Sequence, residues 1–329
     1  MTGSVGILVH GTAAPASLAP TAKAIEDLGF DEIWLSEDYF LLAGISSAAI
    51  TLAATDNIKV GIGILSAVVR HPAVTAMEAA TLAGAFPGRL QVGIGHGVPF
   101  WVKQMDMYPK SPVASLRQVI GTVKRLLDGE ELTETGPFGF DAVKLEHPAA
   151  TPVPVLAGVV GPKSLQLAGE VADGTVMSVI ATPEYLRYAK EQIAIGAAKA
   201  GREAEPHSLP TFVLYHLSDD SAAAEKAARE AVAFYLAAVG PTPMTGVLGF
   251  NDQLAELMAL GDLAKMTERL PSEWVDLFAI HGPADRCAAR IKEFHEAGAD
   301  TVVLAPYPAE AGDAMIAQTA AEVLPLLRG

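Results

Sequence analysis

The sequence is poor in cysteine and in long apolar runs, and both absences limit what the protein can be. Its 329 residues contain one cysteine, Cys287, so no disulfide can form within the chain, which fits a reducing cytoplasm. No apolar run approaches the roughly 18 residues that a membrane span needs. The N-terminus enters a strand pattern directly, without the basic segment and apolar core of a signal peptide. We therefore expect a cytoplasmic protein that does not bind membranes.

Basic residues are also scarce. Lys and Arg number 23 against 38 Asp and Glu, which gives a net charge of −15 at pH 7. This excess argues against nucleic acid as a partner, because the phosphate backbone would be repelled. A small anionic ligand stays compatible if backbone amides, a helix N-terminus or a few basic side chains bind it locally. We expect a small-molecule partner.

Apolar residues make up 50% of the chain and recur in short runs between longer helical stretches. The runs are rich in Val, Ile and Leu, which is typical of strands buried on both faces of a parallel sheet. Three junctions share one design, in which a helix ends at glycine or alanine and an Asp opens the next strand. Repeated αβ junctions with eight strands predict a closed (β/α)₈ TIM barrel of the α/β class. The predicted strands are Ser4–Val9, Glu32–Leu35, Ile58–Leu65, Leu90–Ile94, Val153–Ala157, Gly174–Ser178, Leu209–His216 and Thr301–Leu304.

Two segments interrupt this alternation. Residues 131–147 predict a hairpin excursion between the fourth and fifth strands. Residues 240–273 predict an insertion after the seventh strand, with two short helical stretches. Neither segment has the boundary of a separate domain, so we expect residues 1–329 to form one domain. Cys287 lies mid-helix beside alanines, so we expect it to be a core residue.

In such barrels, the catalytic and binding residues gather at the carboxyl ends of the strands. This rule selects His10 after strand one, Asp38 and Tyr39 after strand two, and His96 after strand four. His216 ends strand seven. Three strand-end histidines suggest a metal site, but no His-x-His, bridging lysine or clear fourth carboxylate accompanies them. We therefore predict no metal.

Glycines occur where a ligand could approach the backbone. Gly61 and Gly63 face the same side of the third strand, which predicts either a slot for a planar ring or a bulge or tight packing against a helix. The run from Gly93 to Val98 fails the dinucleotide fingerprint, because its third glycine falls one place early and no helix is expected immediately after it. Its turn still fits a loop over a ligand, with His96 projecting from it.

The helix after the fifth strand has a start that suits an anion. Gly161-Pro162-Lys163 places proline at the first helical position and leaves amides free at the positive end of the helix dipole. Such an end binds phosphate, and Lys163 adds charge. The alternative is an ordinary helix start.

In this order and spacing, these pieces resemble the deazaflavin-dependent branch of the bacterial luciferase-like superfamily, which includes methylenetetrahydromethanopterin reductases. The resemblance covers nearly the whole chain and implies an α/β barrel, usually a homodimer. It implies coenzyme F420 as the cofactor or, elsewhere in the superfamily, FMN. The most specific block consists of Arg70-His71-Pro72, Thr81-Leu82, Pro87-Gly88-Arg89 and Gly93-x-Gly95-x-Gly97.

The resemblance also implies roles for single residues. It implies a non-prolyl cis peptide between Gly63 and Ile64, in a bulge that backs the deazaflavin ring. Ser66 matches a hydroxyl position that contacts the cofactor, and Asp38 matches an acidic residue near the ring or tail. The other residues expected at the cofactor lie in the glycine turn and in the loop after strand five: Gly95, Gly97, Val98, Val160, Gly161, Pro162 and Lys163.

Three positions depart from the family pattern. Tyr39 stands where a histidine often follows the strand-two Asp, and Val98 stands where the sugar-phosphate dehydrogenases have a glutamate. Ala181-Thr182 replaces the lysine that those enzymes place after strand six. We therefore expect no sugar-phosphate substrate, and we expect Tyr39, His96 or His10 to act as the catalytic proton relay.

The main hypothesis is an oxidoreductase that moves hydride between F420 and a mostly apolar organic substrate. The runner-up is an FMN-dependent monooxygenase that uses reduced flavin and O₂, because both cofactors share a tricyclic ring and a ribityl phosphate. A third hypothesis is a barrel that binds its cofactor without turnover, because the family's glutamate and histidine are both replaced.

Overall fold

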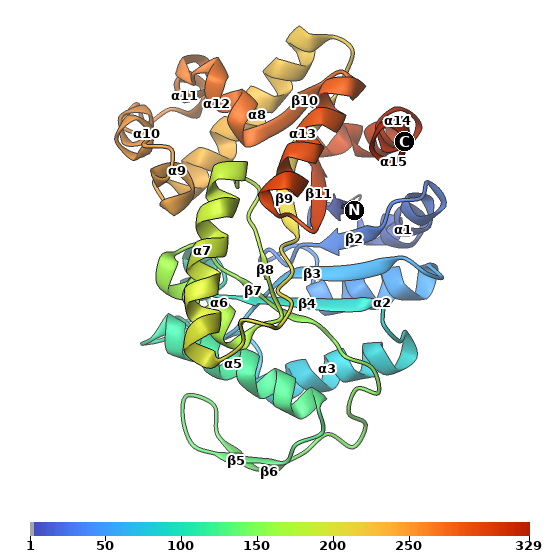
Figure 1. Ribbon diagram of the computed structural model, residues 1–329, viewed down its shortest axis with the longest axis vertical. Helices are drawn as coiled ribbons and strands as arrows, with labels where there is room; N and C mark the ends of the chain where they lie inside the picture. The colour runs from blue at the N-terminus through green and yellow to red at the C-terminus, as the bar shows by residue number, and fades with distance from the viewer. Residues whose placement is uncertain (1–2) are drawn as a thin grey trace.

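A parallel sheet of nine strands forms the centre of the protein, in the order β10-β9-β11-β1-β2-β3-β4-β7-β8 (Figure 1). This computed structural model describes residues 3–329. Eight strands match the predicted ones to within two residues at each end, and β10 is additional. The strands are β1 (Ser4–Val9), β2 (Glu32–Leu35), β3 (Lys59–Ser66), β4 (Leu90–Gly95), β7 (Val155–Gly158), β8 (Gly174–Val176), β9 (Thr211–Leu217), β10 (Ala279–Gly282) and β11 (Thr301–Pro306).

The two ends of the sheet meet at β9. Backbone bridges join Gly174 to Ser208 and Met177 to Thr211, and the amide of Phe212 donates to the carbonyl of Met177. Further along, residues 214–217 of β9 pair with β10 instead. The bridges bring β8 back to β9, as a TIM-barrel arrangement requires, and β10 extends one side of the sheet.

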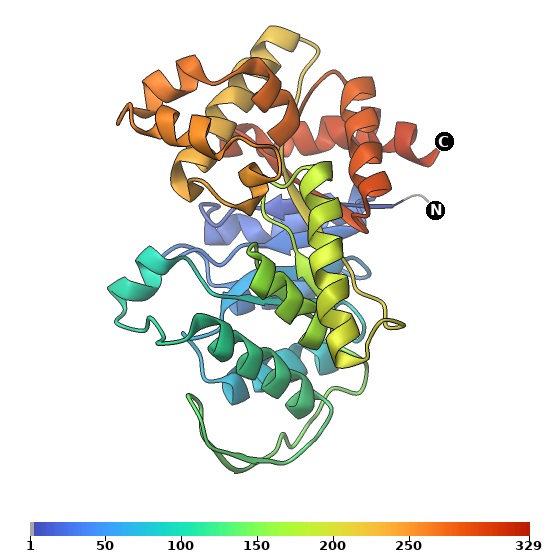
Figure 2. The same ribbon diagram turned by 60° about the vertical axis from the view of Figure 1, so that its left-hand side comes forward.

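Helices connect the strands and pack around the sheet, as Figure 2 shows from a second side. Apolar strand residues are buried towards both the helices and the barrel interior, as expected for a parallel sheet. The main helices are α1 (Leu18–Asp27), α2 (Gly44–Ala54), α3 (Pro72–Ala85), α5 (Pro112–Leu127), α6 (Pro162–Val171), α7 (Pro183–Ala200), α8 (Ser221–Val239), α13 (Ala284–Ala297) and α14 (Gly312–Glu322), which α15 (Leu324–Arg328) follows.

The three aspartates at the αβ junctions tie neighbouring strands together at their amino ends. Gly29 and Gly298 end the preceding helices with positive φ, as predicted for two of these junctions. Each carboxylate accepts a hydrogen bond from a backbone amide of an adjacent strand or of the residue that leads into it: Asp31 from Val5 at 2.8 Å, Asp173 from Val155 at 3.0 Å and Asp300 from Leu209 at 2.7 Å. The repeated Asp therefore satisfies donors that the ends of the strands would leave unpaired.

Both interrupting segments are present, at opposite ends of the molecule in Figures 1 and 2. Residues 131–147 contain the predicted hairpin, in which β5 (Leu132–Glu134) pairs antiparallel with β6 (Phe140–Val143). The segment 240–273 has more helix than predicted, because Thr242 and Asp262 cap two of its helices with their side chains. Its helices are α9 (Pro243–Gly246), α10 (Asn251–Met258), α11 (Leu263–Arg269) and the start of α12 (Ser272–Phe278).

Two further predictions concern membrane spans and the single cysteine. Among residues 3–329, none of the helices is both long and apolar enough for a membrane span. Cys287 is fully buried on α13, which confirms it as a core residue, and this burial raises the pKa of its thiol to about 12.

Candidate functional site

The space that Gly61 and Gly63 leave open is filled by the protein's own rings. A Cβ on Gly61 would lie 2.4 Å from the indole of Trp34, and one on Gly63 would lie 2.6 Å from the ring of Phe212. Trp34 is fully buried and packs edge to face on Phe212, with ring centroids 5.5 Å apart. The prediction that these glycines leave a slot for a cofactor ring is therefore wrong. Both glycines pack tightly against strand side chains and not against a helix, and the alternative prediction of a bulge in this strand is confirmed by the register shift between Ile62 and Leu65.

Strand β3 bulges where the resemblance implies. Its pairing with β4 shifts register between Ile62 and Leu65, and the peptide between Gly63 and Ile64 is cis. The expected peptide geometry is thus confirmed. Gly63 and Ile64 are partly exposed, whereas the residues on either side of them in the strand are buried. The bulge therefore presents backbone and one apolar side chain within the mouth of the barrel.

Three glycines on neighbouring strands make room for Ile64. A Cβ on Gly93 would lie 2.7 Å from the Ile64 side chain, one on Gly95 2.2 Å and one on Gly158 2.5 Å. The glycines at the ends of β4 and β7 thus seat this isoleucine between the strands. Because β4 and β7 both contact the Ile64 side chain, this side chain has a fixed position and forms an apolar surface in the mouth of the barrel.

The loop after β2 carries a buried ion pair that sequence reasoning missed. Arg70 donates to both carboxylate oxygens of Glu37, at 2.6 and 2.7 Å. The same carboxylate accepts from the hydroxyl of Tyr39 at 3.1 Å and from the amide of Gly44 at 2.9 Å. Burial, and next the Glu37 charge, raise the pKa of Tyr39 to about 12. Tyr39 is therefore protonated at neutral pH, and its hydroxyl donates a hydrogen bond to Glu37.

A chain of contacts runs from Tyr39 across the ends of β3 and β4. The hydroxyl of Ser66 is near enough to Tyr39 to lower its pKa slightly, and it lies 3.5 Å from the carbonyl oxygen of His96. Gly97 has a φ of 73°, and a Cβ there would lie 2.7 Å from the Ser66 hydroxyl oxygen. The structure thus brings together predicted residues from three strands.

His96 extends this group to the start of α6. Its Nε2 lies 3.2 Å from the hydroxyl of Ser164, and burial lowers the pKa of its imidazole, so the ring is neutral at pH 7. Gly161 is the N-cap of α6 and Pro162 opens it, as predicted. A Cβ on Gly161 would meet nothing within 4 Å, and Lys163 is exposed. The amides and the ammonium group are therefore accessible to an anion.

The turn after β4 differs from expectation at its end. A short helix, α4 (Pro99–Gln104), begins directly after it with Val98 as N-cap, so the expectation that no helix follows is wrong. Proline at the first helical position favours this start. The dinucleotide fingerprint still fails on its glycine spacing.

Across the barrel mouth, the carbonyl of Val160 accepts a hydrogen bond from the hydroxyl of Tyr185 at 2.8 Å, which fixes the loop after β7.

A second group of side chains joins β1, β2 and β11. His10 Nε2 lies 2.8 Å from the carbonyl oxygen of Pro306, and the imidazole interacts electrostatically with the carboxyl of Asp38. Burial raises the pKa of Asp38. Tyr235 of α8 lies close enough to Asp38 and Tyr307 for their charges to affect its own ionisation. Nothing in the local sequence around Tyr235 indicates this position, because α8 is long and alanine-rich.

The three strand-end histidines have separate partners. His10 pairs with Pro306 and His96 with Ser164, and His216 Nδ1 lies 2.6 Å from the carbonyl oxygen of Tyr307. In the described part of the chain, residues 3–329, no three His, Cys, Asp or Glu side chains come together as metal ligands would.

Part of the sequence block that carries the resemblance has a structural role. The guanidinium of Arg89 donates to the carbonyls of Leu52, Thr55 and Ile58 at 3.3, 2.9 and 3.0 Å. These bonds satisfy carbonyls at the end of α2 and hold the turn before β3. His71 Nδ1 accepts from the amide of Ala73 at 3.3 Å at the start of α3.

Residues 2–301 match the family model described as luciferase-like monooxygenase. The chain belongs to this family. A 5,10-methylenetetrahydromethanopterin reductase of Methanolobus tindarius is 30% identical to it, over 87% of this chain and 89% of that protein. An F420-dependent glucose-6-phosphate dehydrogenase of Nakamurella multipartita is 27% identical, over 95% and 93% respectively. The fold of the present chain is similar to that of the F420-dependent tetrahydromethanopterin reductase of Methanopyrus kandleri, with a TM-score of 0.85, 24% identity and 99% of each chain covered.

The comparisons confirm the predicted family and the luciferase-like TIM-barrel fold. The residues named for the cofactor and for proton transfer stay predictions, although the structure groups most of them at one end of the barrel.

Proposed function

We propose that this luciferase-like protein is an F420-dependent oxidoreductase, which transfers hydride between the deazaflavin and a mostly apolar organic substrate. The observation that carries the proposal is the bulge at Gly63 and Ile64, partly exposed in a strand that is buried on either side. The relatives named above, a reductase and an F420-dependent dehydrogenase, support this choice. When bound, the deazaflavin supplies the carbon that carries the hydride.

The residues at the barrel mouth fit this cofactor. Ile64 offers an apolar floor for a flat ring, and Ser66 offers a hydroxyl beside it. The first turn of α6 offers free amides at Gly161 and the exposed ammonium of Lys163, which suit a phosphate. An acidic chain needs such a local site, because its net charge repels anions.

Proton handling is assigned to His10 and His96. The charge of His10 acts on the carboxyl of Asp38, whose pKa is raised by burial, which brings its proton exchange closer to neutral pH. His96 has a neutral imidazole that can accept or donate a proton. The hydroxyl of Tyr39 instead donates a hydrogen bond to Glu37, and its pKa is about 12. We therefore assign Tyr39 a positioning role and not proton transfer.

The surroundings of the mouth favour an apolar substrate. Phe40, in the loop after β2, and Phe100, in the first turn of α4, are 68% and 66% exposed. Where the sugar-phosphate dehydrogenases place a lysine, Ala181 and Thr182 are fully buried, and the Thr182 hydroxyl accepts from Tyr185 N at 3.2 Å to cap α7. That position therefore offers no group for a phosphate.

Parallel titrations with F420 and with FMN, followed by ring fluorescence, test the proposal. We expect F420 to bind about tenfold more tightly or better, which corresponds to about 1.4 kcal/mol, and to exchange hydride with at least one member of a panel of apolar carbonyl and alkene compounds. Tighter FMN binding, with oxygen consumed by the reduced flavin, would favour the monooxygenase. Tight F420 binding without exchange across the panel would favour a binding protein.

A further inference from the structure

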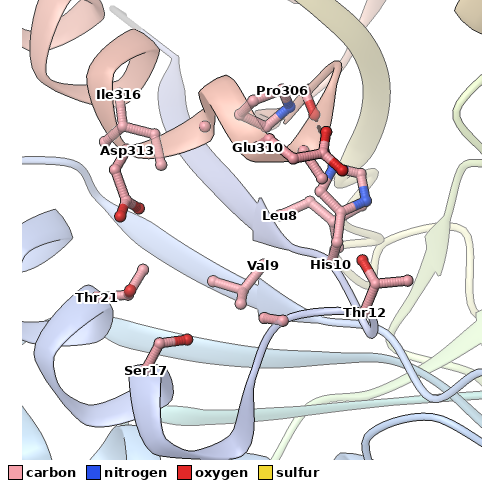
Figure 3. Close-up of a pocket in the computed structure, with 13 residues that line it drawn as sticks. Leu8, Val9, His10, Thr12, Ser17, Thr21, Pro306, Glu310, Asp313 and Ile316 are labelled. Atoms are coloured by element: carbon pink, nitrogen blue, oxygen red, sulfur yellow. Dashed lines mark hydrogen bonds between the residues drawn. The ribbon is translucent and has the colours of Figure 1, made fainter.

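We propose that a cavity beside the barrel mouth is a second binding site, for a short aliphatic amine or amino alcohol. The cavity lies between the carboxyl ends of β1 and β11 and the helices α1 and α14, and it has a volume of about 360 Å³ (Figure 3). This volume suits a small organic molecule.

The walls of the cavity combine apolar and hydroxyl groups. Val9, Pro306 and Ile316 supply apolar surface from two strands and one helix. Opposite them, the loop after β1 and the start of α1 supply the hydroxyls of Thr12, Ser17 and Thr21. A ligand with a short hydrocarbon chain and polar ends would match this pattern.

Two carboxylates, Glu310 and Asp313, set the charge of the cavity. Neither Lys nor Arg lines it, and within residues 3–329 neither carboxylate forms a salt bridge. Figure 3 shows that Asp313 extends from α14 towards the wall that carries Thr21, while Glu310 lies near His10. Asp313 also lies in the first turn of α14, where its charge favours the helix. Glu310 lies in the short 3-10 helix Ala309–Ala311 that leads into α14.

This charge selects the ligand. An ammonium group beside either carboxylate would donate charge-assisted hydrogen bonds to it, and nearby hydroxyl oxygens would accept hydrogen bonds from the remaining N–H groups. An anion would be repelled, so the phosphate-bearing cofactor does not suit this cavity. The site is therefore separate from the one proposed for F420, and it does not depend on that proposal.

One residue links the two sites. His10 lines the cavity, and the Nε2 of its ring lies 2.8 Å from the carbonyl oxygen of Pro306. A bound amine would therefore contact a residue to which we assign proton handling.

Thermal unfolding and calorimetric titration of the cofactor-free protein test the proposal, with three four-carbon probes at constant ionic strength. The probes are 1,4-diaminobutane, 1,4-butanediol and succinate. We expect the diamine to bind with a Kd of about 1 mM or below and to raise the Tm as it is added. We expect the diol to bind more weakly and succinate not to bind.

Variants locate the binding. E310Q and D313N should each weaken diamine binding about fivefold, as the loss of a partly exposed ion pair predicts. Glu256→Gln and Asp219→Asn, which remove exposed carboxylates elsewhere, should leave it unchanged. Thr21→Leu should abolish it by filling the cavity while keeping a good helix former on α1. Because D313N lowers the stability of α14, the measured quantity is the change in Tm caused by the probe.

Three results would overturn the proposal. The first is that the diamine does not bind at concentrations up to about 50 mM, far above the millimolar range expected. The second is that the diol binds as tightly as the diamine. The third is that the cavity variants and the two control variants lose the same diamine affinity. The last result would show attraction to the acidic surface in general.

Discussion

The guanidinium of Arg70 spans both carboxylate oxygens of Glu37, at 2.6 and 2.7 Å, and joins the loop after β2 to the residues before α3. The Glu37 side chain is 1% exposed and that of Arg70 is 21% exposed. A bidentate pair in such an enclosed place is strong, but the loss of one partner leaves the other charge buried and uncompensated. The pair also holds Tyr39 beside the proposed ring site.

Arg70→Met should lower the free energy of unfolding by about 3–5 kcal/mol, because it leaves the Glu37 carboxylate buried without a counter-charge. Urea denaturation measures the loss. Arg187→Met is the matched control, since Arg187 is exposed and lies 3.9 Å from Glu184, and it should cost under about 1 kcal/mol. The double variant E37Q/R70M should recover part of the loss. Equal costs for the two arginine variants would contradict the buried-pair account.

Gly158→Ala should displace Ile64, which forms the apolar surface of the proposed ring site. The new Cβ would lie 2.5 Å from Cδ1 of Ile64, so the isoleucine side chain must shift. We expect hydride transfer to fall by about tenfold or more, because small misplacements of bound reactants are costly. Gly84→Ala on α3, where a Cβ meets nothing within 4 Å, is the control. Adding Ile64→Val to G158A removes the closest atom, Cδ1, and should restore part of the rate. An unchanged rate of hydride transfer in G158A would show that Ile64 does not position the cofactor.

Asp300→Ala should destabilise the amino end of the barrel. The variant leaves the amide of Leu209 without the carboxylate that lies 2.7 Å away, and a hydrogen bond to a charged group contributes about 1.5–3 kcal/mol. Hydrogen exchange at Leu209 and urea denaturation together measure the effect. Asp219→Ala removes an exposed carboxylate and should change stability by less than about 0.5 kcal/mol. If Leu209 exchanges no faster in the variant, the carboxylate does not hold this junction.

His207 should make the protein less stable in mild acid. It lies 2.8 Å from the hydroxyl of Thr175, and burial lowers the pKa of its imidazole to about 4. The folded state therefore resists protonation more than the unfolded state, whose His has a pKa of about 6.5. The stabilisation is present above pH 6.5 and is lost as the pH falls towards 4, with a slope of up to about 1.4 kcal/mol per pH unit.

Unfolding free energies measured from pH 7 to pH 4 in wild type and in His207→Gln test this assignment. The glutamine can keep a hydrogen bond to Thr175 but does not titrate, so the slope should decrease. His147→Gln, at an exposed position in the loop after β6, should keep the wild-type slope. Identical slopes in all three proteins would show that other groups cause the acid sensitivity.

The three candidate proton-handling residues should differ in their effects. His10→Gln and His96→Gln should each lower kcat by about 100-fold with any substrate that the panel identifies, as expected for a lost general acid or base. Tyr39→Phe should lower it by about tenfold or less, because its hydroxyl serves Glu37. Single-turnover measurements separate these losses from product release. A Tyr39→Phe, His96→Gln double variant with full turnover would remove both residues from the mechanism.

Much of the fold could be predicted because its signals are local. Buried parallel strands need near-continuous Val, Ile and Leu, so each of the eight appears as a short apolar run, and positive φ at Gly29 and Gly298 needs glycine. The insertion 240–273 was harder, because its short helices depend on single capping side chains and not on a long periodic pattern.

The candidate site, like the fold, was predictable from the sequence only in part. The order of strands placed His10, Asp38, Ser66 and His96 at one end of the barrel, because parallel strands all end on the same side. The Glu37–Arg70 pair, the rings of Trp34 and Phe212 over Gly61 and Gly63, and the seat of Ile64 all join residues from different elements. Local sequence determined which elements form, because backbone conformation depends on near neighbours. Only the tertiary structure decided which side chains fill each space, because burial and pairing depend on residues that are distant along the chain.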